Sequence, residues 1–467
     1  MIHVTLDRTS AIPLIRQLYD GMRAQILSGV LRPGSRLPSS REMAGQLGVS
    51  RNVVVEAFEM LYSEGFTTAR HGSGTFVAPG TTFPAAVAEK KRITLAKVSM
   101  GYESQAGVIN FKPGTPDLRE FPLRAWLQAV KAAYLHPADD SLGYGQPEGR
   151  RELRQAICDY VVSQRGVACD PDQIVITAGT TQAIGIACHL LLGERRDVIL
   201  EDPITRDIQL IVKGEGGVIH PVTADDSGLV VEELPSGISP AFVYVTPSHQ
   251  FPLGGTLAIQ RRIALLEYVE RTGACLIEDD YDSEFRFDGP ALASLQSLAP
   301  DRVVYIGTFS KTLSPALRTG YLILPPALVG EGRGRKWHCD LHNETPTQLA
   351  LAHFIATGGY LRHLGRMKRL YARKRRVLEQ ALAAHFGAAV RIIGSATGLH
   401  LAARFSGIVF TPELLAELEK KRVRVYPAEA HAIKPGRLDD IILIGYGNLS
   451  EAQIEQGIRI LHRVINR

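Results

Sequence analysis

A lysine at the end of an apolar run carries the most distinctive chemistry of the sequence. Val303-Val304-Tyr305-Ile306 has the continuous apolar pattern of a buried strand, and it leads into Gly307-Thr308-Phe309-Ser310-Lys311, with Arg318 soon after. The lysine amine can form an imine with an aldehyde, while hydroxyls and a guanidinium can hold a phosphate. The segment predicts a site for a phosphorylated aldehyde cofactor. This segment alone is weak evidence for such a site, because lysines near strand ends are common.

An acidic segment follows a second apolar run. Ala274-Cys275-Leu276-Ile277 predicts a strand, and Glu278-Asp279-Asp280-Tyr281 comes directly after it. A carboxylate at the end of a strand can keep a pyridine nitrogen protonated, and a nearby phenol can bond the 3-oxygen of such a ring. The alternative is a solvated acidic loop, which we expect for Glu278, Asp280 and Asp282 taken singly.

A third segment favours phosphate binding. Ile174-Val175-Ile176-Thr177 predicts a strand, and the turn Ala178-Gly179-Thr180-Thr181 opens a helix whose first N–H groups can face a phosphate. Many α/β proteins have such a turn. The lysine segment, the acidic segment and this turn together predict a site for a phosphorylated aldehyde cofactor much more strongly than any one of them alone.

The first 78 residues predict a different kind of module. Ile15, Leu18, Met22 and Ile26 recur at helical spacing, so we expect a helix there. Ser39 and Glu42 form a capping box for a second helix that ends at Gly48, and Ser50 can cap a third helix from Arg51 to about Ser63. Two β-prone runs, 65–70 and 75–77, flank the glycine-rich tip His71-Gly72-Ser73-Gly74 and predict a hairpin.

Two short helices joined by a tight turn are typical of a helix-turn-helix, whose second helix enters the major groove of DNA. Arg51 and Asn52 lie in the first turn of that helix, where Arg51 can reach guanine or phosphate and Asn52 can reach adenine or phosphate. The alternative is a small dimerisation domain with Arg41 and Arg51 in solvent. Eight arginines against six acidic residues in residues 1–78 give this module little excess charge, which favours that alternative mildly.

The chain of 467 residues is expected to hold a DNA-binding domain (1–78), a linker (79–108) and a large α/β domain (109–467). A net charge of +5 permits an anionic partner without requiring one. The five cysteines have neither metal-ligand spacing nor a disulfide pattern, so we expect a reducing compartment and no metal site. Without a signal peptide or a bilayer-spanning apolar run, a cytoplasmic location is predicted, with no membrane partner.

The N-terminal module resembles the GntR family of bacterial winged-helix regulators. The match rests on Leu37-Pro38-Ser39-Ser40-Arg41 and on the wing residues Gly72-Ser73-Gly74-Thr75-Phe76-Val77, with Met43 where the family pattern has leucine. The resemblance implies that the DNA contacts are Arg41, Arg51, Asn52, Gly72 and Ser73.

Residues 109–467 resemble the fold-type-I aminotransferases. The resemblance implies a mainly parallel sheet with flanking helices, a smaller C-terminal α/β subdomain, and pyridoxal 5'-phosphate (PLP) as cofactor. It assigns Lys311 to the internal aldimine, Asp279 to the pyridine nitrogen and Tyr281 to the 3-oxygen. It assigns the phosphate to Gly179, Thr180, Thr181, Thr308 and Arg318. Tyr144 looks like the residue that reaches a neighbouring subunit's phosphate, which implies a homodimer.

Several positions depart from the enzyme pattern. Phe251 stands where the enzymes carry an asparagine that bonds the 3-oxygen, and Thr205 stands where an aromatic ring stacks on the cofactor. Ala430 and Leu443 stand where related proteins carry carboxylate-binding arginines, which an apolar side chain cannot replace. Arg206 can serve a carboxylate from another direction, or it can be a surface or helix-terminal arginine.

The order of the two domains and the segment Thr246-Pro247-Ser248-His249-Gln250-Phe251-Pro252 resemble the MocR-type regulators. This resemblance implies a nucleoid-associated regulator that binds a double-stranded DNA operator. It would sense PLP, or a small amine or amino acid, by aldimine exchange at Lys311. One alternative is an aminotransferase that also binds DNA, although the departures favour at most half-reactions. Another is a cofactor-free fold that serves as a dimer scaffold. The basic run between Arg366 and Arg376 is either a solvated helix face or an auxiliary DNA contact.

Overall fold

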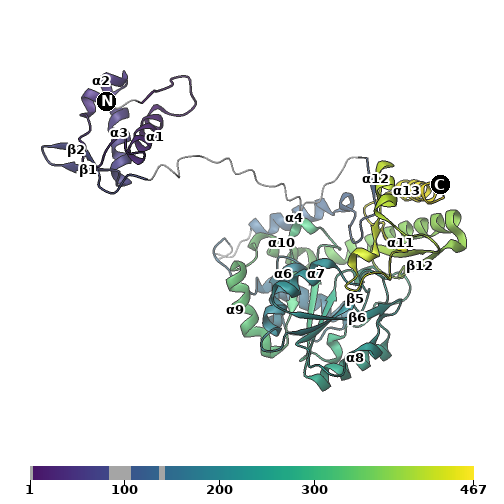
Figure 1. Ribbon diagram of the computed structural model, residues 1–467. Coiled ribbons are helices and arrows are strands. Elements are labelled where there is room, and N and C mark those ends of the chain that lie inside the picture. Colours follow the sequence, from purple (N-terminus) through teal and green to yellow (C-terminus); the bar gives the residue numbers. More distant parts are fainter. Residues whose placement is uncertain (1–3, 84–106, 136–141, 467) are drawn as a thin grey trace. The chain divides into compact units, whose positions relative to one another are not determined.

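The computed structural model describes residues 4–83, 107–135 and 142–466. The chain divides into two compact units, Met1–Glu103 and Ser104–Arg467, and each is described by itself (Figure 1). No helix in these described ranges is long and apolar enough to cross a membrane.

The N-terminal unit is a three-helix module with a hairpin. Its elements are α1 (Leu14–Leu27), α2 (Ser40–Leu47), α3 (Arg51–Ser63), β1 (Thr67–Arg70) and β2 (Gly74–Val77). The predicted capping box is confirmed, because the Ser39 hydroxyl accepts from Glu42 N–H and the Glu42 carboxylate accepts from Ser39 N–H. Gly48 ends α2 in the left-handed conformation. Ser50 occupies the N-cap position of α3 as predicted, but its side chain makes no capping bond.

An eight-stranded sheet forms the centre of the second unit. The strand order is β4-β11-β10-β9-β8-β5-β6-β7, in which β11 and β7 run antiparallel to their neighbours and the others are parallel. The strands are β4 (Ile174–Thr177), β5 (Asp197–Asp202), β6 (Val218–Asp225), β7 (Gly228–Leu229), β8 (Phe242–Val245), β9 (Cys275–Asp280), β10 (Val303–Thr308) and β11 (Gly320–Ile323).

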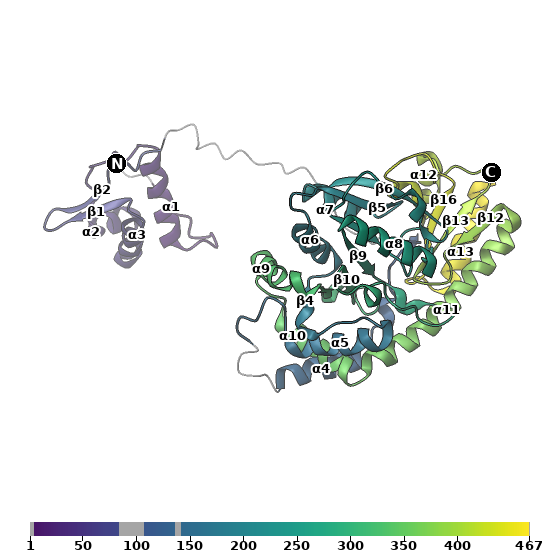
Figure 2. The same cartoon turned by 90° about the horizontal axis from the view of Figure 1, so that it is seen from below.

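Helices cover both faces of this sheet (Figure 2). Along β5, Val198 and Leu200 pack in the core that includes residues of α6 (Thr180–Leu191) and α7 (Arg206–Gly214). Ile199 between them packs in the core beneath α8 (Ile259–Thr272). Alternate side chains of a strand point to opposite faces, so the continuous apolar runs read from the sequence are those of a sheet buried on both sides.

The remaining elements build the outer layers and a smaller C-terminal sheet. That sheet has the order β12-β13-β16-β15 and is antiparallel, and a short parallel pair joins β3 to β14. Its strands are β12 (Val390–Ile393), β13 (His400–Phe405), β15 (Tyr426–Pro427) and β16 (Ile441–Gly445); the pair is β3 (Ile109–Asn110) and β14 (Val423–Arg424). The helices are α4 (Leu123–Leu135), α5 (Arg151–Arg165), α9 (Val329–Asp340), α10 (Thr345–Ala356), α11 (Gly359–Phe386), α12 (Pro412–Lys420) and α13 (Glu451–Ile465). The predicted fold class is confirmed.

Candidate cofactor and DNA sites

The carboxyl ends of β9 and β10 bring Lys311 and Asp279 to one edge of the sheet. The two strands are parallel, with Ile306 opposite Asp279, and Lys311 follows in the turn after β10. Lys311 Nζ lies 3.1 Å from the position that a Cβ on Gly114 would take, so this glycine leaves room for the amine. Burial lowers the pKa of Lys311, against the attraction of Asp282 and Asp279. This favours the neutral, nucleophilic form of the amine.

Asp279 is buried at 5% exposure with one carboxylate oxygen unsatisfied. Its Oδ2 accepts a hydrogen bond from the Tyr244 hydroxyl on β8 at 2.5 Å, while Oδ1 has no partner. Burial raises the pKa of Asp279 to about 7, and the Tyr244 bond opposes this rise. A buried acceptor without a donor is costly, so Oδ1 fits a ligand that brings an N–H group.

Tyr281 lies just beyond β9, and its hydroxyl contacts His249 in the loop after β8. Its hydroxyl donates to the backbone carbonyl of His249 at 3.0 Å and lies 2.9 Å from His249 Nδ1. Burial raises the pKa of Tyr281 well above its usual value, so the phenol keeps its proton and can donate it. Phe251 lies edge-on to Tyr281, with ring centroids 6.1 Å apart.

The predicted phosphate residues converge at the start of α6. Gly179 precedes the helix with φ 99° and ψ 177°, a conformation open essentially to glycine alone, and no side chain caps the helix. A Cβ at Gly179 would lie 3.3 Å from both terminal nitrogens of Arg318, which also bonds the carbonyl of Ala178. Thr180 and Thr181 form the first turn of α6, so backbone N–H groups and a guanidinium surround one small space.

Thr308 lies close to this space at the end of β10. It pairs with Gly320 on β11, which in turn lies against Gly179, since a Cβ on Gly320 would meet the Gly179 backbone at 3.0 Å. Its hydroxyl lies 3.1 Å from that of Ser310.

Tyr144 lies apart from the other predicted cofactor residues. It is 83% exposed, and its only described ring contact is an edge-on one with His342 at 6.2 Å. A tyrosine this exposed makes little contact within its own chain.

The acidic segment is not a solvated loop, and that expectation is wrong for Glu278, Asp280 and Asp282. Their exposures are 0%, 7% and 1%. Glu278 accepts from the backbone of residues 295 and 296, and Asp280 forms an ion pair with Arg165 at 2.7 Å. Asp282 bonds His249 Nδ1 at 2.9 Å. All three have partners distant in sequence, which the local pattern of acids could not indicate.

Three residues bear on the binding of a carboxylate or another small ligand: Leu443, Arg206 and His431. Leu443 on β16 is fully buried in a cluster that includes Leu253 and Ile441, so no cation points inward from that position. Arg206 is the first residue of α7 and is exposed, which leaves its two interpretations open. His431 lies edge-on to Phe251 at 5.1 Å, and burial lowers its pKa to about 4.

The predicted DNA contacts form an exposed set on the first unit. Arg41, Arg51, Asn52, Gly72 and Ser73 are all exposed. Arg51 Nε donates to the Ser40 hydroxyl at 3.2 Å, which links the starts of α2 and α3. The first turn of α3 therefore faces solvent, as a recognition helix requires.

The basic run on α11 is mostly committed to partners within the chain. Lys374 is buried, with Nζ 2.8 Å from Asp117, and Arg375 pairs with Asp288 at 2.9 Å. Arg366 and Arg373 pair with Glu120 and Glu451. These contacts favour a structural role over an auxiliary DNA contact.

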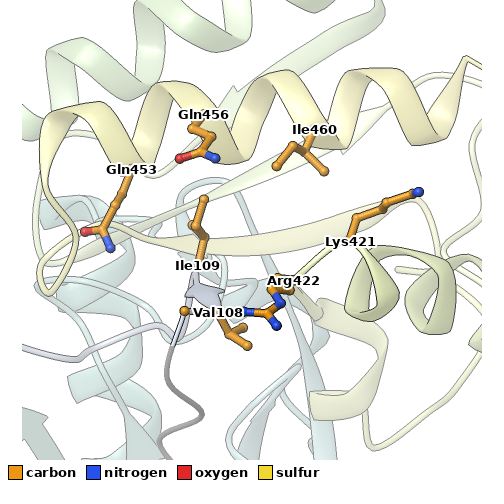
Figure 3. A pocket seen from close by; sticks show the side chains of 8 residues that line it. Val108, Ile109, Lys421, Arg422, Gln453, Gln456 and Ile460 are labelled. Carbon is orange, nitrogen blue, oxygen red and sulfur yellow. The ribbon is translucent and has the colours of Figure 1, made fainter.

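Sequence reasoning missed several buried groups beside Lys311 and Tyr281. They are Glu201, Tyr244, His249 and His400. The partners of His249 are Asp282, just beyond β9, and His400 on β13, and both are far along the chain. A separate pocket of about 230 Å³, shown in Figure 3, contains none of the predicted site residues. Its lining is Gly107, Val108, Ile109, Lys421, Arg422, Gln453, Gln456 and Ile460.

Comparisons with known proteins agree with this two-part organisation. Residues 14–77 match the family of bacterial regulatory proteins called gntR, and residues 106–458 match aminotransferase class I and II. The probable rhizopine catabolism regulatory protein MocR of Rhizobium meliloti is 34% identical, covering 98% of this chain and 95% of its own. The pyridoxine biosynthesis transcriptional regulator PdxR of Corynebacterium glutamicum is 35% identical over 78% of each chain.

Among solved structures, the α-aminoadipate aminotransferase LysN of Thermus thermophilus, complexed with N-(5'-phosphopyridoxyl)-L-leucine, is similar to the second unit. It has a TM-score of 0.71 and 26% identity, covering 77% of this chain and 92% of that one. The chain belongs to the MocR-type branch of the GntR family, transcriptional regulators that join a helix-turn-helix domain to a class I/II aminotransferase domain.

Proposed function

We propose that this regulator binds PLP through Lys311 and changes its binding to a DNA operator when a small amine, an amino acid or PLP itself reaches that site. The observation that carries the proposal is the unsatisfied Oδ1 of Asp279, buried at the same sheet edge as Lys311. A protonated pyridine nitrogen is the donor this oxygen lacks.

The site offers residues for the phosphate, the ring nitrogen and the 3-oxygen of PLP. Gly179, Thr180, Thr181, Thr308 and Arg318 would bind the phosphate, Asp279 would hold the proton on the ring nitrogen, and Tyr281 would donate to the 3-oxygen. When bound, PLP would supply an aldehyde carbon that forms an imine with an amine. Lys311 would be the amine of the protein that holds this carbon, and burial, which lowers its pKa, favours the neutral form that can do so.

The output of such a sensor would be a change in DNA binding. A ligand shifts an equilibrium only when it binds two states unequally, so release of Lys311 must favour one arrangement of the large domain. We propose Arg41, Arg51, Asn52, Gly72 and Ser73 as the DNA contacts, and a cytoplasmic homodimer as the active form. Two copies of the helix-turn-helix would then read two half-sites.

A working aminotransferase is the second candidate, favoured by the match to class I and II aminotransferases. Buried Leu443 and small Ala430 count against it, because neither can bind a substrate carboxylate. We expect half-reactions at most. A cofactor-free scaffold is the third candidate, and it leaves the unpaired oxygen of Asp279 unexplained.

One pair of measurements tests the leading proposal. The purified protein reconstituted with PLP should absorb visible light, and Lys311→Ala should abolish that band while the melting temperature stays close to wild type. Operator fragments recovered by genomic footprinting should then bind with an affinity that depends on PLP and on one of a panel of amines. A wild type that stays colourless contradicts PLP binding. An affinity that no amine and no PLP alters contradicts sensing. Accumulation of pyridoxamine phosphate over many turnovers would favour the enzyme.

A further inference from the structure

The hydroxyl of Tyr281 is contacted twice by one buried residue. His249 is 2% exposed, and its carbonyl accepts the Tyr281 proton at 3.0 Å. Its ring nitrogen Nδ1 lies 2.9 Å from the same phenol oxygen, and the two rings stack with centroids 5.7 Å apart. The position of this oxygen therefore depends on His249.

Asp282 determines which ring nitrogen of His249 carries the proton. Its two carboxylate oxygens lie 2.9 and 3.1 Å from His249 Nδ1, and Asp282 is 1% exposed. A carboxylate only accepts hydrogen bonds, so Nδ1 must bear the proton. That N–H also faces the phenol oxygen of Tyr281. The single Nδ1–H is therefore shared between the Asp282 carboxylate and the phenol oxygen, and the phenol donates its own proton to the His249 carbonyl.

The surrounding backbone and a second histidine hold this pair in place. A Cβ on Gly398 would lie 2.2 Å from His249 Cε1 and 2.4 Å from Asp282 Oδ2, so only glycine fits there. The His400 ring lies 4.9 Å from that of His249, and its Nε2 donates to the Pro252 carbonyl at 3.0 Å. The pair is built into the fold.

The same three groups do not make a good metal site. One ligand atom from each of His249, Asp282 and His400 falls within 4.8 Å of the others. Both oxygens of Asp282 are already engaged by His249, which leaves His249 Nε2 and His400 Nδ1 as unpartnered atoms. Two free ring nitrogens fall short of the three or four protein ligands of zinc sites. We therefore interpret the group as a hydrogen-bonded unit.

We propose that His249, oriented by Asp282, is a positioning residue that strengthens Tyr281 as a hydrogen-bond donor to the 3-oxygen of PLP. This inference rests on the proposed binding of PLP. Phe251 cannot donate a hydrogen bond, so Tyr281 has to support the 3-oxygen without the asparagine of the enzymes. When the 3-oxygen is present, the Tyr281 proton would turn from the His249 carbonyl to the 3-oxygen, while the phenol oxygen keeps its share of the His249 Nδ1–H.

A phenol that accepts a hydrogen bond is polarised and becomes a stronger donor. Donation to the 3-oxygen stabilises the form of the bound cofactor that has lost its imine proton, because that form carries the more negative oxygen. His249 should therefore lower the pH at which this proton is lost. Other titratable groups face Tyr281 and His249 from neighbouring elements and form a common background: Glu201, Asp279, Asp280, Asp282, Lys311, His400 and His431.

The test is a pH titration of the visible absorption of the full-length, PLP-reconstituted protein. Tyr281→Phe should move the midpoint to higher pH. His249→Leu should move it in the same direction by about half a pH unit to one unit, the size expected for one lost hydrogen bond. His249→Asn should restore the wild-type midpoint, because its side-chain amide can place an N–H near the position of Nδ1. In the Tyr281→Phe background, His249→Leu should add no further shift.

A second readout separates positioning from folding. PLP affinity, followed by tryptophan fluorescence, should fall only a few-fold in His249→Leu, and the melting temperature of the PLP-free protein should be equal for the Leu and Asn variants. If His249→Leu does not fold, His249→Ala, which also removes the Nδ1–H and keeps the Asp282 charge, should shift the midpoint upward instead. The inference is overturned if folded, PLP-loaded His249→Leu titrates like wild type, or if its shift persists without the Tyr281 hydroxyl. A wild type that binds no PLP contradicts the proposed function itself.

Discussion

Four buried carboxyl groups at the sheet edge and beside it retain protons to higher pH than usual. Burial raises the pKa of Glu201, Glu278, Asp279 and Glu284 to about 7. Such a group binds more protons in the folded than in the unfolded state between its unfolded pKa and about pH 7. Its contribution to stability is therefore greatest at low pH and is lost as pH rises towards 7. Histidines with lowered pKa, such as His431, act in the opposite direction, so one carboxyl must be isolated to observe the effect.

The replacement Asp279→Asn isolates the contribution of one buried carboxyl to stability, because asparagine has nearly the same shape and no charge to bury. In the PLP-free protein, we expect the stability of Asp279→Asn relative to wild type to rise between pH 4 and pH 7. The slope should be at most roughly 1.4 kcal/mol per pH unit, and the difference should level off above pH 7. Urea unfolding at several pH values measures it. A relative stability that falls over this interval would show that Asp279 is stabilised as an anion.

The same replacement should also weaken PLP binding. PLP should bind Asp279→Asn at least about 10-fold more weakly, since asparagine cannot hold the ring proton as a carboxylate does.

The start of α6 is the element that we propose binds the phosphate of PLP. Its first turn has no side-chain cap, and Gly179 allows the Arg318 guanidinium to approach the turn closely. Gly179→Ala would add a Cβ 3.3 Å from Arg318 at a backbone conformation that alanine avoids. We expect PLP affinity to fall by about 10-fold or more, a loss of about 1.4 kcal/mol.

Gly185→Ala is the matched control for this prediction. Gly185 lies in the same helix, and its Cβ would have nothing within 4 Å. The replacement should leave PLP affinity unchanged and stabilise the helix slightly, by about 0.5–1 kcal/mol. Titration of both PLP-free variants with PLP, followed by absorbance, gives the comparison. Equal affinities in the two variants would mean that the turn at Gly179 is not the phosphate site.

The start of α3 plays the corresponding part in the DNA-binding unit. Arg51→Ala should weaken operator binding by about 10-fold or more, because it removes a contact to a base or phosphate. Arg16→Ala is the control, since Arg16 is an exposed arginine on α1 that pairs with Asp20. Fluorescence anisotropy with a labelled operator at fixed salt measures both. A larger loss for Arg16→Ala than for Arg51→Ala would overturn this assignment of the DNA-reading face.

Local patterns predicted the elements better than they predicted the interior of the site. The strand at Val303–Ile306 and the helix starting at Arg51 have periodicity and end signals within a few residues, and both are where the sequence placed them. Burial of the acids could not be predicted in this way. Asp280 is buried because Arg165 and Tyr305 reach it from α5 and β10, and these contacts exist only after the sheet has formed.

At the scale of the whole molecule, Tyr144 is the residue that the isolated chain leaves unexplained. It is 83% exposed, although the aminotransferase resemblance implies a contact with a phosphate. A homodimer in which each Tyr144 reaches the partner's site resolves the conflict, because every site would then use residues of both chains. Such a dimer would also bury an aromatic ring that is costly to leave in water.

Subunit complementation tests this arrangement. Tyr144→Ala should lower PLP affinity, and Lys311→Ala should abolish the visible band of bound PLP. Coexpression of the two variants should produce mixed dimers with one complete site, built from Lys311 of one chain and Tyr144 of the other. In the purified mixed dimer about half of the sites should have wild-type affinity, because each mixed dimer has one complete site of two. The measurement is absorbance during PLP titration of dimers purified with two different tags. A mixed dimer with no site of wild-type affinity would mean that Tyr144 serves its own chain.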